Sequence, residues 1–227
     1  MNSVDVAWVF GRPALGLPAA VATRLRSYGT ERIPQSGGLV LAINHFHWID
    51  IPCIGWVCKR NIYYLAKVEA HRVPGLGPFI RTFGTLSVRR GESDREAVRL
   101  MREVVRKGNV LGVFVEGTRQ KTGVPGHVQP GAAMAALQGD VPVICAAIYG
   151  SDKWRPVNFA PVSIAWSEPM TFEGLPRGAK GYREASAQIE DELNRLWRWL
   201  RDLHQAGRPR VATPPTRGDA APVTLPA

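Results

Sequence analysis

The sequence has few cysteines, and none is placed as a disulfide partner or a zinc ligand would be. Only three occur in 227 residues, Cys53, Cys58 and Cys145, an odd number without CxxC spacing. Each lies among apolar neighbours, where a free thiol behaves as a small core residue. The sequence therefore argues against a disulfide scaffold, and it predicts buried thiols in a reducing compartment and no metal site.

A long hydrophobic run is also missing. No stretch reaches the roughly 18 to 20 apolar residues that a membrane-spanning helix needs. The nearest approach, residues 4–23, contains two charges and two prolines that would break a helix: Asp5, Arg12, Pro13 and Pro18. A secretory leader would begin with positive charge, whereas the first charge here is negative. Residues 1–28 are therefore predicted to be a membrane-associating segment that lies along a surface through residues such as Trp8 and Phe10, and an ordinary helix covering the core is the alternative.

Acidic residues are in short supply. The 19 Asp and Glu face 29 Lys and Arg, of which 23 are arginines, so the net charge is +10 and the pI is about 10.1. Such a balance favours an anionic partner, whether nucleic acid, a phosphorylated small molecule or an acidic membrane surface. A solvated arginine-rich surface is the alternative. Nucleic-acid modules stack bases on aromatic residues of a basic face, and the tryptophans here accompany apolar stripes, so no nucleic acid is expected.

Several nucleotide and hydrolase motifs are absent. The chain has no Walker A sequence and no dinucleotide-binding glycine pattern, which weighs against nucleotide binding. It also lacks the GxSxG nucleophile elbow, which weighs against a serine hydrolase.

What the sequence does contain is an alternation of apolar runs and helical patterns. Strands are predicted at residues 38–43, 61–66, 85–88, 110–115, 141–148 and 162–166, and helices after residue 50 and at residues 79–83, 93–107, 130–137 and 182–204. This alternation predicts an α/β fold with a mixed, mainly parallel sheet flanked by helices. One domain should occupy residues 29–204, while residues 205–227, rich in Pro, Ala and Thr without an aromatic residue, should be disordered.

Two of these helices have identifiable starts. The one after residue 50 can accommodate Pro52 in its first turn, with Ile51, Ile54 and Val57 spaced to face a core. The helix at 93–107 should begin with a capping box of Ser93 and Glu96, and Gly108 should end it.

Two histidines and a carboxylate follow the first buried strand, in the stretch Asn44-His45-Phe46-His47-Trp48-Ile49-Asp50. A histidine can remove a proton from an alcohol, and a carboxylate on its other ring nitrogen fixes the tautomer. Five residues of continuous helix would place His45 and Asp50 about 140° apart, so the pair needs His45 in a loop and Asp50 at the helix start. Asp50 could instead be an N-cap, with His45 a satisfied loop histidine, and spacing alone does not choose between His45 and His47.

Cations and one carboxylate stand at the ends of other predicted strands. Lys67, Arg89-Arg90 and Arg119 follow three different strands, and parallel strands would bring their carboxyl ends to one edge, where the cations could hold a phosphate. Glu116-Gly117-Thr118 precedes Arg119. Glu116 either points toward a cleft or is a surface charge, and Gly117 permits a tight turn that brings Thr118 and peptide N–H groups near an anion. Scattered solvated arginines are the alternative.

The order of these motifs resembles that of the glycerolipid acyltransferases, most closely the 1-acylglycerol-3-phosphate (lysophosphatidate) acyltransferase group. The resemblance covers residues 36–170 and rests on four segments in order: Asn44-His45-x4-Asp50, Gly84-Thr85-Leu86-Ser87-Val88-Arg89-Arg90, Phe114-Val115-Glu116-Gly117-Thr118-Arg119 and Val141-Pro142-Val143. It implies the glycerol-3-phosphate acyltransferase-like fold. It also selects His45 over His47, because His45 and Asp50 match the family's H-x4-D.

The resemblance further implies acyl transfer to a hydroxyl without a covalent acyl-enzyme. His45 would deprotonate the acceptor and Asp50 would orient His45, while Arg89, with Lys67 and Arg119, would hold the acceptor phosphate. Glu116, Gly117 and Thr118 match the segment that the family uses in acceptor binding, and residues 141–143 would shape the donor side. The donor would be acyl-CoA or acyl carrier protein as co-substrate, without a cofactor.

The acceptor implied is a lysophospholipid, foremost 1-acylglycerol 3-phosphate. Bulky Phe46, His47 and Trp48 fill the variable positions of the first motif, so glycerol 3-phosphate, another lysolipid or an amino-acid-derived lipid are alternative acceptors. The expected location is peripheral, on the cytoplasmic face of the cell membrane, through residues 1–28 and the basic surface. A non-catalytic basic protein that binds anionic membrane is the rival from another class.

Overall fold

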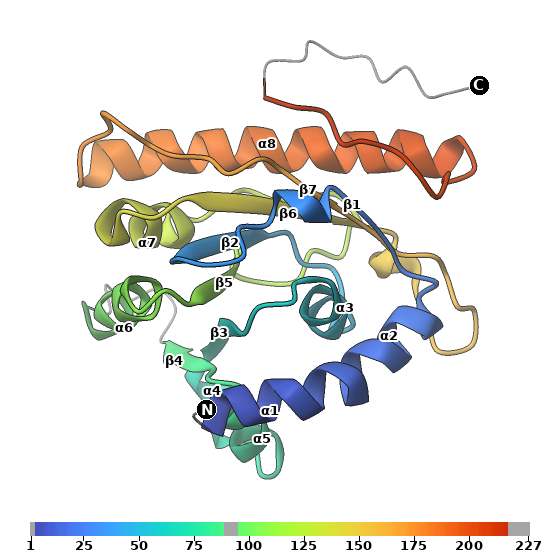
Figure 1. The fold of residues 1–227 in the computed structure, drawn as a ribbon, viewed down its shortest axis with the longest axis horizontal. Helices are drawn as coiled ribbons and strands as arrows, with labels where there is room; N and C mark the ends of the chain where they lie inside the picture. Colours follow the sequence, from blue (N-terminus) through green and yellow to red (C-terminus); the bar gives the residue numbers. More distant parts are fainter. Residues whose placement is uncertain (1–2, 89–94, 218–227) are drawn as a thin grey trace.

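A computed structural model describes residues 3–88 and 95–217 (Figure 1). Over these ranges the chain forms a seven-stranded sheet in the order β1-β7-β6-β2-β5-β3-β4. The strands are β1 Arg26–Tyr28, β2 Leu39–Ile43, β3 Ile62–Lys67, β4 Leu86–Val88, β5 Val110–Phe114, β6 Val143–Tyr149 and β7 Ser163–Trp166. Helices cover both faces, so the predicted α/β class is confirmed.

The sheet is mainly parallel, as predicted. Strands β6, β2, β5, β3 and β4 run in one direction, and β7 with its parallel neighbour β1 runs in the other, because β6 and β7 pair antiparallel. The last residues of β2 and β5 are register partners, Ile43 with Phe114, as are those of β3 and β4, Lys67 with Val88. Five carboxyl ends therefore share one edge, where α/β proteins place their sites.

Side chains that alternate along β2 divide the core into two halves. Val40 and Ala42 pack with the helices of one face, α6 Arg95–Arg106, α7 Gly131–Gly139 and α8 Ala179–Gln205. Leu41 and its alternate neighbours pack toward the other face, with α1 Ser3–Gly11, α2 Leu17–Ala22 and α3 Asp50–Val57. Because both faces are covered, β2 is buried over its whole length, which explains its unbroken apolar sequence.

Residues 3–22 form a nearly continuous helical rod along the side of the molecule opposite α8 (Figure 1). The predicted helix breaks at Pro13 and Pro18 do not occur. The backbone stays helical through Gly11 and Gly16, and a π-helical turn, Arg12–Gly16, lies between α1 and α2 and contains Pro13. Trp8 and Ala19 are buried in the core. The rod therefore covers the core and also exposes apolar side chains to solvent, and the membrane association of this segment stays a prediction.

Two local predictions need correction, and a third is confirmed at one end of its helix. The predicted core-facing residues of α3 were Ile51, Ile54 and Val57, but Ile51 is exposed. The face of the helix that packs on the core instead contains Asp50, Cys53, Ile54 and Gly55. The region after Lys67 holds two short helices, α4 Val68–Arg72 and α5 Leu76–Thr82, where a turn and one helical piece were predicted. Gly108 does end α6, with φ at 78°, while Ser93 lies outside the described residues.

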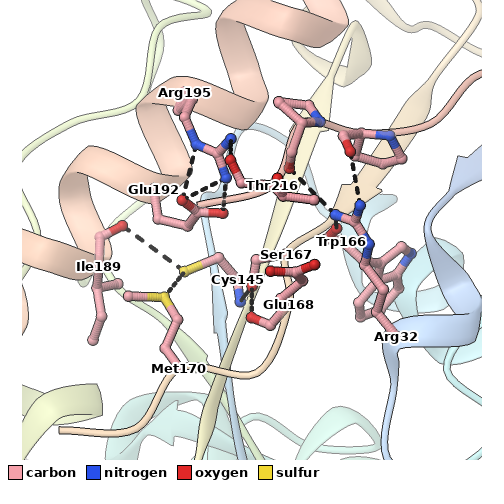
Figure 2. Close-up of polar contacts among 12 residues, drawn as sticks. Arg32, Cys145, Trp166, Ser167, Glu168, Met170, Ile189, Glu192, Arg195 and Thr216 are labelled. Carbon is pink, nitrogen blue, oxygen red and sulfur yellow. Dashed lines mark hydrogen bonds and ion pairs between the residues drawn. The ribbon is translucent and has the colours of Figure 1, made fainter. Parts of the chain in front are cut away.

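The described part of the C-terminal segment contradicts the expected disorder. Residues 206–217 run back along α8 and are tied by arginine side chains, which Figure 2 shows in part. Arg32 donates to the Pro214 carbonyl at 2.7 Å, Arg195 donates to the Thr216 carbonyl at 2.6 Å, and buried Arg208 donates to Ser163 Oγ at 2.8 Å. Composition predicts disorder from the segment's own few apolar residues, but two of these bonds come from donors elsewhere in the fold, and the third joins the segment's Arg208 to Ser163 of β7.

The three cysteines are free and buried, as predicted. Within the described ranges, none of the helices has the length and the apolar character needed to cross a bilayer.

Candidate active site

His45 and Asp50 meet in the loop between β2 and α3. His45 Nδ1 lies 2.9 Å from Asp50 Oδ2, and the same oxygen accepts the peptide N–H groups of Phe46 and His47, each at 2.8 Å. Asp50 is fully buried as the first residue of α3, and its carboxylate points back over the preceding loop. It is therefore not the N-cap of α3; it shapes the loop that holds His45.

The ring of His45 is fixed on two sides. Because Asp50 accepts hydrogen bonds, His45 Nδ1 carries the proton and Nε2 keeps its lone pair. The ring stacks on Phe114 with centroids 4.0 Å apart and planes 27° apart, and 13% of its side-chain surface is exposed. Nε2 is thus the free basic atom, held at the sheet edge with limited access to solvent.

The loop after β5 fixes the backbone of His45. The His45 N–H donates to Glu116 Oε2 at 2.7 Å, and the His45 carbonyl accepts the Gln120 N–H at 2.8 Å. The second oxygen of Glu116 accepts the Gly126 N–H at 3.0 Å. Both carboxylate oxygens are therefore occupied by peptide groups, and Glu116 faces the histidine loop instead of open cleft or surface. Burial raises the pKa of Glu116 to about 7, although these two hydrogen bonds favour its charged form.

The predicted acceptor cations are at the same edge of the sheet. Lys67 ends β3, and Arg119 lies in the loop that follows β5, next to the residue bonded to His45. Both side chains are exposed, and neither forms an ion pair with another described residue. Gly117 has φ at 72° and closes a tight turn to the Phe114 carbonyl, which carries Thr118 and Arg119 outward. Arg89 falls outside the described residues, so its predicted role stays a prediction.

An aromatic cluster that the sequence did not reveal lies beside His45. His47 contacts Trp48 and Trp154, with ring centroids 5.5 and 5.4 Å apart, and Trp48 contacts Trp154 at 5.8 Å. Burial lowers the pKa of His47, and nearby Arg155 and Arg119 lower it further, against Asp50, which raises it. Trp154 and Arg155 follow β6, so the strand-end rule that found Arg119 would also have pointed to them.

Asn44 ties the histidine loop to β6. Its side chain donates to the Ile148 carbonyl at 3.0 Å and accepts the Ile148 N–H at 2.7 Å, although it is fully buried. The sequence contained an indication of this role, because a single amide at the end of a wholly apolar strand must find partners when it is buried. Among the described residues no group of three or more His, Cys, Asp or Glu side chains is placed to hold a metal ion.

Comparison with known proteins shows the family and the fold. A family model with the description acyltransferase matches residues 24–149, which is more than half of the chain and includes His45, Asp50 and the loop after β5. The chain belongs to the acyltransferase family. Its mixed sheet and helices also superpose on PlsC of Thermotoga maritima, the 1-acyl-sn-glycerophosphate (LPA) acyltransferase, with a TM-score of 0.69 and 24% identity over 88% of this chain and 79% of that one.

Two proteins with similar sequences are named as acyltransferases that act on different lipids. This acyltransferase is 28% identical over 175 residues to the 1-acyl-sn-glycerol-3-phosphate acyltransferase of Bacillus subtilis, which covers 75% of this chain and 84% of the relative. A shorter match of 76 residues, 34% identical, is to the lyso-ornithine lipid O-acyltransferase of Pseudomonas aeruginosa and covers 33% of this chain and 29% of the relative.

Replacing Glu116 by Gln tests whether this acyltransferase uses the residue to position His45. An amide has one acceptor oxygen, so one of the two peptide N–H groups would face an NH2 donor instead. We expect kcat to fall about tenfold to a hundredfold while KM for the acceptor stays within about twofold, because the base moves and the acceptor contacts remain. Steady-state kinetics with both substrates measure this, with exposed Glu173→Gln as the matched control. A raised KM with unchanged kcat would instead assign Glu116 to acceptor binding.

The same variant has a distinct effect on stability. Because the pKa of Glu116 in the folded protein is about 7, above the ordinary 4.5, the folded state binds this proton more tightly than the unfolded state. Its contribution to the free energy of unfolding therefore falls as pH rises between these two values. Glu116→Gln should flatten the pH dependence of stability in that window in denaturant titrations.

Proposed function

We propose that this protein transfers a fatty acyl group from acyl-CoA or acyl carrier protein to the free hydroxyl of a lysophospholipid, foremost 1-acylglycerol 3-phosphate, giving phosphatidic acid. The observation that carries the proposal is the 2.9 Å contact between His45 Nδ1 and Asp50 Oδ2 at the sheet edge, which leaves Nε2 as a free base. Membership of the acyltransferase family supports it, as does the similarity to relatives named for this acceptor.

The geometry suits general-base catalysis of a direct transfer. His45 Nε2 takes the proton of the acceptor hydroxyl, and the acceptor oxygen attacks the thioester carbonyl carbon. The tetrahedral intermediate then collapses, the C–S bond breaks, and the departing thiolate takes the proton back from His45 Nε2. Asp50 stabilises the imidazolium that forms between these steps. The reaction is balanced without a cofactor, and no covalent acyl-enzyme forms.

Replacing His45 by Ala should abolish transfer. Purified protein with acyl-CoA and lysophosphatidate should release free CoA, measured with a thiol reagent, and form phosphatidic acid, measured by mass spectrometry. We expect the variant to lose at least about a thousandfold in kcat, because the general base and the orientation it provides disappear together. His127→Ala is the control, since the His127 side chain is 80% exposed and its ring pairs with Glu190 of α8. Transfer at the wild-type rate by His45→Ala would refute the mechanism.

We propose that cations around this edge of the sheet bind the phosphate of the acceptor. Lys67 and Arg119 follow adjacent strands and are free of described ion pairs, so their charges are available to a ligand. Arg89, from the sequence motif, completes the proposed set. The partial match to a lyso-ornithine lipid enzyme supports the alternative of an amino-acid-derived acceptor, and an acceptor panel separates the two.

Lys67→Ala and Arg119→Ala should each raise KM for lysophosphatidate. A lost charge-assisted hydrogen bond is worth about 1.5 to 3 kcal/mol, so the expected increase is about tenfold to a hundredfold. The increase should disappear with 1-acylglycerol, which lacks the phosphate. Lys59→Ala is the control, because Lys59 lies between α3 and β3, at the opposite edge of the sheet. Equal effects on both acceptors would remove these residues from phosphate binding.

We further propose that the protein is peripheral on the cytoplasmic face of the cell membrane. Supporting this, the rod of residues 3–22 exposes apolar side chains over its length, among them Val6, Val9, Phe10, Leu15, Leu17 and Val21. Helix α5 packs against α1 and exposes Leu76 and Phe79. An apolar face of this kind, on a protein of net charge +10, suits the surface of an anionic bilayer.

Removal of residues 1–28 would not test this cleanly, because Trp8 and Ala19 belong to the core. Val9→Ser with Phe10→Ser removes exposed surface only. We expect binding to phosphatidylglycerol-containing vesicles, measured by flotation, to fall about tenfold or more, because two inserted side chains are lost. Val211→Ser is the control, since Val211 is exposed in the segment that follows α8. Unchanged vesicle binding by the double variant would exclude this face as the contact.

A further inference from the structure

The loop of residues 154–160, between β6 and β7, presents apolar side chains outward. Val157 is 89% exposed and Phe159 is 49% exposed. The loop lies beside the carboxyl end of α2 in Figure 1, away from α8. Single exposed hydrophobic residues are common, but two in one short loop beside another exposed apolar element form a patch that requires an explanation.

The 154–160 loop is fastened to the end of α2. Trp154 Nε1 donates to the Ala22 carbonyl at 3.0 Å, and Arg24 Nε donates to the Phe159 carbonyl at 3.0 Å. Just beyond the loop, the Val162 N–H donates to the Thr23 carbonyl at 2.9 Å. The loop and α2 therefore form one structural unit.

Internal hydrogen bonds hold the loop in shape. Asn158 Oδ1 accepts the N–H groups of Arg155 and Ala160, at 2.8 and 3.0 Å, and its amide donates to the Lys153 carbonyl at 2.9 Å. Arg155 Nη1 donates to the carbonyls of Asp152 and Trp154. The apolar side chains are thus displayed by an ordered loop.

Two residues of this unit have unfavourable backbone angles. Arg24 has φ at 44° and Phe159 has φ at 48°, in the left-handed region that a bulky side chain rarely adopts. They are joined by the hydrogen bond from Arg24 to the Phe159 carbonyl. The surrounding bonds therefore hold Phe159 in a conformation that costs energy and leaves half of its surface in solvent, which suggests a function at the surface.

We propose that the 154–160 loop is a second membrane-inserting element, which together with α2 orients the site on an anionic lipid bilayer. The proposal rests on the proposed function, because the acceptor would enter from that bilayer. Val21 of α2 is 66% exposed and directly precedes Ala22, whose carbonyl accepts the Trp154 hydrogen bond, so an exposed apolar residue of the helical rod is next in sequence to the contact with the loop. Three cations lie in or next to these segments of the sequence: Arg24 follows α2, and Lys153 and Arg155 lie at the start of the loop. Their positive charge suits anionic lipid headgroups.

The loop also connects this surface to the catalytic loop. Trp154, which bonds to α2, contacts the rings of His47 and Trp48, and Trp48 is 52% exposed. Tryptophan favours the boundary between lipid and water. Insertion of the loop therefore fixes the distance between the bilayer surface and the residues next to His45.

A labelling experiment tests insertion directly. All three native cysteines are buried, so Val157→Cys provides a single accessible thiol for an environment-sensitive fluorophore. Adding vesicles of phosphatidylglycerol and phosphatidylcholine should shift its emission to the blue, whereas a label at Val211→Cys should not respond. Vesicle binding without a shift at position 157 would overturn the proposal, as would failure of the wild-type protein to bind vesicles.

A second variant tests the consequence for turnover. Val157→Ser with Phe159→Asn removes apolar surface, and asparagine tolerates the left-handed backbone at position 159. Vesicle binding and turnover of bilayer-embedded lysophosphatidate should fall about tenfold or more, because insertion is lost. Turnover of a short-chain acceptor dissolved as monomer should stay at the wild-type rate, as should all activities of Val211→Ser.

The two proposals fail separately. If the wild-type protein binds vesicles and the label at position 157 shifts, but no acyl transfer occurs with soluble substrates, the loop proposal stands and the proposed function fails. If soluble substrates turn over and the loop variant binds vesicles as the wild type does, the proposed function stands and the loop proposal fails.

Discussion

The site depends on one carboxylate oxygen. Asp50 Oδ2 accepts the ring N–H of His45 and two successive peptide N–H groups, all at 2.8 to 2.9 Å, so it fixes both the tautomer of the base and the curve of the loop. A buried carboxylate is costly without donors, and here three donors converge on Oδ2 while buried Oδ1 has no described hydrogen-bond partner. These three donors are the His45 ring and the loop that carries it, the parts that the proposed mechanism needs in place. These contacts also account for the five-residue separation of His45 and Asp50, because the chain must turn around this oxygen before α3 begins.

A second set of contacts comes from neighbouring strands. The loop after β5 occupies the N–H and the carbonyl of His45 through Glu116 and Gln120, and Asn44 bridges to β6. His45 is therefore held by elements from three adjacent strands, β6, β2 and β5. Such support suits a reaction in which a free alcohol must be deprotonated and aimed in a single geometry. It also explains why a carboxylate with a pKa of about 7 is retained in a buried position.

Six of the seven strands and their mainly parallel arrangement could be predicted, because apolar runs are local properties of the sequence, and the His45–Asp50 pair followed from the family's H-x4-D motif. Strand β1 was missed, because its residues Arg26–Tyr28 do not form an apolar run. The direction of Glu116 could not be predicted, since a carboxylate after a strand can point to a cleft, to solvent or to a neighbouring loop. The order of residues 206–217 was missed for a related reason. Their partners are arginines of distant elements, such as Arg32 and Arg195, and composition says nothing about donors that only the folded chain brings near.

These distant partners also affect the order in which the chain can fold. Among the described strands, β1 pairs with β7 alone, while Tyr28 donates to the Pro209 carbonyl and Arg208 donates to the Arg24 carbonyl. The segment after α2 therefore has its partners more than 130 positions later in the chain. On the ribosome, the first helical turns emerge long before the residues that complete their attachment. The attachment of this segment to the sheet is therefore complete only when nearly all of the described chain is available.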